Sequence, residues 1–102
     1  MNYSWAYIFH APESDPAKDR FVIDRAGCKC TLVAVPDNAA AARVAVELMR
    51  SGAKSIELCG YFGPMGAVEV LRAVEGKVAV GTVMFGSESI ANVMKAFLGG
   101  DS

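Results

Sequence analysis

The sequence predicts an α/β fold, in which a mainly parallel sheet of four to five strands packs with three helices. Two observations lead to this prediction. Short apolar runs alternate with amphipathic stretches through the second half of the 102-residue chain, a pattern typical of βαβ units. Nearer the start, two extended runs separated by R-A-G at 25–27 predict a β-hairpin. We therefore expect one domain over residues 1–102, with the order β-β-β-α-β-α-β-α.

The first third of the chain supplies three of the expected strands. The run from Trp5 to Phe9 is aromatic and too short for a helix, so it predicts a strand. Residues 11–20, A-P-E-S-D-P-A-K-D-R, predict a long polar loop with a helical turn begun at Asp15. The two arms of the hairpin follow at 21–24 and 28–35. The second arm is more apolar, which predicts that it lies deeper in the sheet.

The first helix and the strand after it have clear boundary signals. Asp37 is a suitable N-cap, and Gly52 is a suitable C-terminal stop. Between them, helical spacing predicts a buried face made of Ala41, Val44, Ala45, Leu48 and Met49. Residues 55–59 then predict the next strand of the parallel part of the sheet.

The last two helices and the strand between them complete the expected alternation. Pro64 suits the first position of a helix that runs to about Glu75. Its predicted buried face consists of Ala67, Val70, Leu71 and Val74. The nearly continuous apolar run at 77–85 predicts a buried parallel strand. Ser87 is the expected cap of a third helix, whose apolar face consists of Ile90, Val93, Met94, Phe97 and Leu98.

Composition excludes several classes of partner. The net charge is −1 and the basic residues are scattered, which argues against nucleic acid and anionic membranes as partners. No apolar run approaches the ~18–20 residues that span a bilayer, and the start does not resemble a signal peptide. Three cysteines, an odd number, suit reduced thiols in the cytoplasm. With 53% hydrophobic residues in so short a chain, we expect a homo-oligomer.

The expected topology places a ligand site at one edge of the sheet. In open α/β sheets, ligands bind beyond the carboxyl ends of the parallel strands. Four loops meet that description, at residues 9–11, 36–38, 59–64 and 85–89. Their convergence predicts a small-molecule site, and no sequence motif calls for a cofactor.

The glycine-rich turn G-Y-F-G-P at 60–64 has two interpretations. In the structural one, Gly60 or Gly63 takes a positive φ and Gly66 allows close packing. In the functional one, the helix N-terminus binds an anionic group, joined by a second N-terminus at Ser87 and Glu88. The spacing matches no phosphate-binding motif, and no lysine accompanies it. The aromatic pair Tyr61–Phe62 either covers a pocket or belongs to an interface.

Glu57, His10 and Cys59 are the candidate catalytic residues. Glu57 interrupts an apolar strand, so it faces water or a polar pocket, pairs with an arginine such as Arg20, or acts as a general base. His10 and Cys59 both lie at the carboxyl ends of predicted strands, although a buried thiol and an exposed edge histidine are ordinary alternatives. The Cys28-x-Cys30 pair has no second pair of ligands nearby, so we expect no metal site.

Three segments resemble an uncharacterised family of short bacterial α/β proteins. They are A-P-E-S-D-P-A-K-D-R, I-E-L-C-G-Y-F-G-P and V-A-V-G-T-V-M-F-G-S-E-S, and the second contains the E-L-C-G-x-F-G-P motif. The resemblance implies a small α/β domain without an established activity. The resemblance also implies that the family's motif positions in this chain are Asp15, Arg20, Glu57, Cys59, Gly60, Phe62 and Gly63. Family members often carry histidine where this chain has Asp19.

Two functional hypotheses follow. In the first, a cytoplasmic protein binds a small anionic metabolite at the carboxyl edge of the sheet, with cofactor-free acid–base chemistry of a lyase or isomerase type. Arg20 then holds the anionic group and Glu57 moves the proton. The other expected ligand-binding residues are Asp15, Gly60, Tyr61, Phe62, Gly63, Ser87 and Glu88. In the second hypothesis, the chain is a non-catalytic ligand sensor or a structural oligomeric module.

Overall fold

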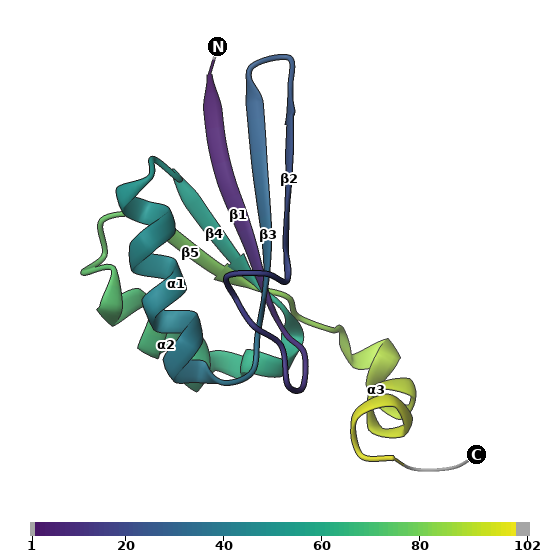
Figure 1. Ribbon diagram of the computed structural model, residues 1–102. Helices are drawn as coiled ribbons and strands as arrows, with labels where there is room; N and C mark the ends of the chain where they lie inside the picture. The colour runs from purple at the N-terminus through teal and green to yellow at the C-terminus, as the bar shows by residue number, and fades with distance from the viewer. Residues whose placement is uncertain (1, 100–102) are drawn as a thin grey trace.

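The computed structural model describes residues 2–99 and confirms the predicted order of elements (Figure 1). The elements are β1 (Tyr3–His10), β2 (Arg20–Arg25), β3 (Cys28–Val35), α1 (Asn38–Arg50), β4 (Ser55–Leu58), η1 (Gly60–Phe62), α2 (Gly63–Ala73), β5 (Ala79–Thr82), η2 (Ser87–Ser89) and α3 (Ile90–Phe97). The five strands form one sheet in the order β2-β3-β1-β4-β5. Only β2 is antiparallel to its neighbour, so the predicted mainly parallel sheet is confirmed.

Local signals set the ends of several elements. The side chain of Asp37 accepts a hydrogen bond of 2.8 Å from the amide of Ala40, so the predicted N-cap of α1 is confirmed. The predicted hairpin is β2–β3, and its turn has positive φ angles of 54° at Ala26 and 80° at Gly27. Two such residues in succession match the right-handed twist of the strands.

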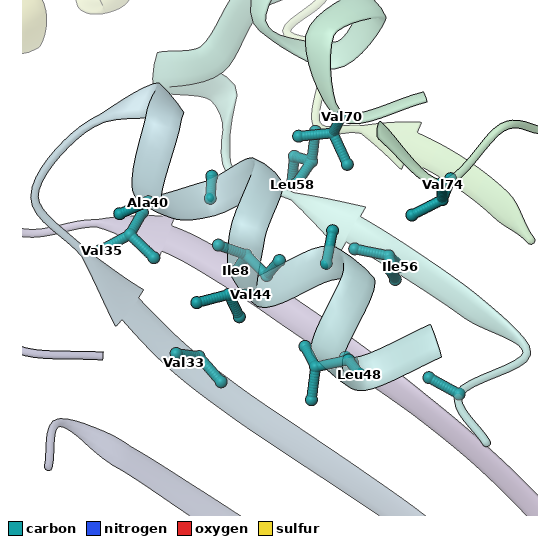
Figure 2. Packing of buried hydrophobic residues seen from close by; sticks show 14 of the residues in the cluster. Ile8, Val33, Val35, Ala40, Val44, Leu48, Ile56, Leu58, Val70 and Val74 are labelled. Carbon is teal, nitrogen blue, oxygen red and sulfur yellow. The ribbon is translucent and has the colours of Figure 1, made fainter. Parts of the chain in front are cut away.

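The hydrophobic core lies between the sheet and the two helices α1 and α2, which cover the same face (Figures 1 and 2). Its fully buried members include Ile8, Val33, Ile56, Leu58 and Val70. The helical spacing predicted four of the five buried residues of α1; it missed Ala40, and Met49, which it included, is only partly buried against the core. The opposite face of the sheet carries no helix (Figure 1). We call it the open face; it consists of Tyr3, Trp5, Tyr7, Phe9, Phe21, Ile23, Arg25, Cys28, Cys30, Leu32, Ala34, Ser55, Glu57, Ala79 and Gly81.

The prediction of a buried strand over 77–85 is wrong in length and in burial. β5 covers only Ala79–Thr82 and has a single neighbour, β4, because it lies at the edge of the sheet. After Thr82 the chain leaves the sheet, so Met84 and Phe85 are exposed. Leu71, expected to face inward, is also exposed, whereas Val70 on α2 and Val74 directly after it are fully buried, as predicted.

The third helix exists, but its predicted cap is wrong. Ser87 lies in the short η2 turn, and neither η2 nor α3 has a side-chain cap. No residue of α3 is buried. Figure 1 shows the reason: α3 lies beyond the carboxyl ends of the strands, apart from the layer that α1 and α2 form. Within residues 2–99, no helix has the length and hydrophobicity required to cross a membrane.

Candidate functional site

A cleft of about 540 Å³ lies at the carboxyl edge of the parallel strands. All four loops that we expected to converge contribute to it, so their predicted meeting at one edge is confirmed. The lining consists of Tyr7, Phe9, His10, Ala11, Pro12, Pro36, Cys59, Gly60, Tyr61, Val83, Phe85 and Phe97. The lining is dominated by aromatic rings, and it contains neither a lysine nor an arginine from the described part of the chain.

His10 ends β1 and is the best-positioned polar side chain of the cleft. Its Nε2 lies 2.8 Å from Oδ1 of Asn38, at the start of α1. An amide oxygen can only accept, so Nε2 carries the hydrogen and Nδ1 is left to accept a proton or a ligand hydrogen bond. The imidazole also packs against Tyr61 and Phe62, with ring centroids 4.7 and 4.4 Å away. These contacts hold the ring in one orientation.

Cys59 joins His10 in the cleft. The backbone N–H of His10 donates to Sγ of Cys59 over 3.4 Å, and the backbone N–H of Cys59 donates to the carbonyl of Ile8 over 3.1 Å. Two of the three candidate catalytic residues are therefore brought together. The sulfur already accepts a hydrogen bond, which fixes its position beside β1.

Tyr7 also lines the cleft, although the sequence interpretation missed it. Burial raises the pKa of its hydroxyl, and the charges of Cys59 and Glu57 raise it further. The signal that would have found it is the period-2 pattern of the first strand, which places Tyr7 and Phe9 on one face. That face becomes part of a site only when β1 pairs in parallel with β4, with Tyr7 opposite Glu57.

Glu57 does not line the cleft. It is exposed on the open face, between Tyr7 on β1 and Gly81 on β5. Within residues 2–99 it forms no ion pair. Glu57 therefore faces water, two residues before Cys59, the first residue of this segment that lines the cleft.

Arg20 and Asp15 lie on the other side of the sheet. Arg20 pairs in register with the core residue Val33, and its guanidinium forms two hydrogen bonds, of 2.8 and 3.2 Å, with Glu47 on α1. Its Nε donates to the carbonyl of Pro16 over 2.7 Å. Asp15 stabilises the turn before β2 by accepting from the amide of Ala17 over 3.0 Å. Neither residue meets Glu57, so the site expected from the sequence is divided between two faces.

The glycines of the 60–66 segment each have a structural reason. Gly63 has a φ of +62°, which favours glycine. A Cβ at Gly66 would lie 3.1 Å from Cβ of Phe62, and one at Gly60 would lie 3.1 Å from the ring of Phe85. Phe62 itself is buried in the core, whereas Tyr61 is 67% exposed and forms one wall of the cleft. The aromatic pair is thus divided between the core and the site.

Ser87 and Glu88 lie outside the cleft. Both are exposed, in the η2 turn that follows the loop through Phe85. Among residues 2–99, no group of three or more His, Cys, Asp or Glu side chains is arranged to hold a metal ion.

The two cysteines of the C-x-C segment should differ in reactivity. Burial raises the pKa of Cys30, and the neighbouring charges of Cys28 and Glu57 add to that effect, whereas Cys28 is exposed. The thiolate is the reactive form. We therefore expect iodoacetamide near neutral pH to alkylate Cys28 before Cys30, as peptide mass spectrometry of a time course would show. Modification of Cys30 first would contradict the described environment of the open face.

Comparison with known proteins places the chain in a family without assigning an activity. No curated protein and no solved structure was found to match it. One family model does match, and it covers residues 3–98, which include every strand and helix described. The chain therefore belongs to the family of unknown function DUF6506.

Proposed function

We propose that this protein binds a small molecule with a flat, mostly apolar body and one polar or acidic group in the cleft at the carboxyl edge. The observation that carries the proposal is the aromatic lining around a single histidine. A volume of about 540 Å³ suits a metabolite-sized ligand. Rings such as those of Phe9, Tyr61 and Phe85 favour a planar partner through stacking and edge-to-face contacts.

The polar end of the ligand lies at His10. Its Nδ1 has no partner among residues 2–99, and His10 is the one lining side chain that can carry a positive charge. The anionic ligand expected from the sequence is therefore held by an imidazolium in this proposal, and Arg20 has no part in it. The hydroxyl of Tyr7 and the thiol of Cys59 are further polar groups at the same end.

An acid–base reaction fits the same geometry. His10 accepts a proton from the ligand at Nδ1, and the hydroxyl of Tyr7 or the thiol of Cys59 donates one to the same polar end of the ligand. Glu57 faces Tyr7 from the neighbouring strand, so it acts on the cleft only through Tyr7. The alternative is a non-catalytic ligand sensor that uses the same residues for binding alone.

An NMR titration tests the aromatic and the acidic part of the ligand separately. Benzoate, benzyl alcohol and acetate are each titrated into ¹⁵N-labelled protein. We expect benzoate, with a Kd on the order of 1 mM, to shift the amides of residues 9–11 and 59–61. Benzyl alcohol should bind more weakly, and acetate weakest of all, because the aromatic body provides most of the contact. If none of the three shifts these amides, the binding proposal is wrong. If acetate binds as well as benzoate, the site recognises an anion alone.

Single substitutions show which side chains contact the bound benzoate. Tyr61→Ala should weaken benzoate roughly 2- to 10-fold, as expected for the loss of one aromatic contact. The control Tyr3→Ala removes an aromatic ring at the opposite end of β1 and should leave the affinity unchanged. His10→Gln should abolish the preference for benzoate over benzyl alcohol. A preference that survives in His10→Gln would remove His10 from the site.

A further inference from the structure

The helix α3 makes few contacts within its own chain: the ring of Phe97 lies beside that of Phe85, with centroids 6.0 Å apart, and lines the cleft. It has only eight residues, and an isolated helix of that length is unstable in water. Its apolar side is formed by Ile90, Val93, Met94 and Phe97, while Asn92 and Lys95 lie on the other side. None of these residues is buried, and Met94 is 53% exposed. The stabilising contacts of α3 must therefore come from a surface outside this helix.

The open face of the sheet is a second unpartnered apolar surface. Phe21 is 71% exposed there, and Ile23 and Tyr3 are also exposed. Trp5, Tyr7 and Leu32 continue the apolar surface across β1 and β3. Among the strand residues that form the open face, the charged ones are Arg25, at one end of the face, and Glu57. An apolar sheet face of this kind is normally covered by another layer.

The accessible surface and the radius of gyration of the chain are both larger than those of a compact monomer of the same size. The accessible surface is 6727 Å², whereas a compact monomer of this mass exposes roughly 5,500 Å². The radius of gyration is 14.5 Å, against about 13 Å for a compact domain of 100 residues. The excess surface exceeds the ~800 Å² per partner that a stable interface buries. The excess of the total accessible surface is therefore of the size that one copy covers in a stable dimer.

We propose that two copies of this chain exchange their α3 helices, each placing the apolar side of α3 on the open face of the other. A second copy is the fitting occupant because each chain supplies both the helix and the face, so a twofold arrangement covers all four surfaces at once. α3 also lies beyond the strand ends, away from α1 and α2, in a position from which it can reach another molecule (Figure 1).

Sedimentation equilibrium of the full chain and three variants tests the exchange. The wild-type protein should sediment with twice the chain mass of 10.8 kDa. Met94→Lys on α3 and Phe21→Glu on the open face should each weaken the dimer at least ~100-fold, because each buries a charge in an apolar contact. The control Leu71→Glu replaces an exposed apolar residue of α2 and should leave the dimer intact. These positions are exposed, so circular dichroism should show folded variants.

Mixing the two monomeric variants distinguishes exchange from other arrangements. In a heterodimer of Met94→Lys with Phe21→Glu, one helix–face contact is wholly wild type and the other places lysine near glutamate. Equimolar mixing should therefore restore at least half of the dimer. A monomeric wild-type protein overturns the proposal and indicates that α3 folds onto its own sheet. A dimer that survives Met94→Lys, or variants that do not recover on mixing, overturns the exchange of helices.

Discussion

Leu58→Ala is expected to lower the free energy of unfolding by about 3 kcal/mol. The side chain is fully buried at the centre of the core, on β4 between β1 and β5 (Figure 2). Removing it loses the transfer free energy of the side chain and leaves a cavity that neighbouring strands cannot fill, because they are fixed by their hydrogen bonds. A domain of this size is stable by roughly 5–10 kcal/mol, so the loss should be evident in urea denaturation.

The same substitution on the surface provides the control. Leu71 is 44% exposed on α2, so Leu71→Ala removes far less buried surface and should cost less than about 1 kcal/mol. Equal losses for the two variants would show that Leu71 is packed in solution and that the orientation of α2 differs from the one described.

Gly63→Ala should have the second largest effect, a loss of roughly 1–3 kcal/mol. Gly63 combines a φ of 62° with a ψ of −179°, a backbone conformation that is essentially limited to glycine. A Cβ at this position would meet nothing within 4 Å, so the cost arises from the backbone and not from a clash. Thermal denaturation followed by circular dichroism would measure it.

Gly81→Ala separates this backbone effect from the general effect of replacing glycine. Gly81 lies in β5, also with nothing within 4 Å of a Cβ, but without a positive φ. Alanine there restricts the unfolded chain and should stabilise the protein by about 0.4–1 kcal/mol. If Gly63→Ala is equally stabilising, the turn after β4 does not have the described conformation.

The candidate site was predicted in its location and only partly in its members. The rule that ligands bind at the carboxyl ends of parallel strands depends on the order of elements, and this order can be read from the sequence. It led to His10, Cys59 and Tyr61. It did not lead to Tyr7 or Phe97, because Tyr7 lies within a strand and Phe97 within a helix, whereas the rule considers only the loops that follow the strands.

The division of the predicted site residues has a physical reason. Period-2 alternation tells which residues of a strand share a face, but not which face the helices cover. Arg20 therefore faces α1 and Glu47, whereas Glu57 faces the open side. Two residues that seemed suitable partners for one anionic ligand are separated by the thickness of the sheet.

The sequence alone determined the fold class, the hairpin, the cap at Asp37 and the edge at which the cleft lies. These features follow from local turn chemistry and from apolar periodicity within single elements. Only the tertiary structure decided the length of β5, the exposure of α3 and the separation of Arg20 from Glu57. Each of these depends on strand order and on which surface is covered, and such long-range pairing leaves no local pattern in the chain.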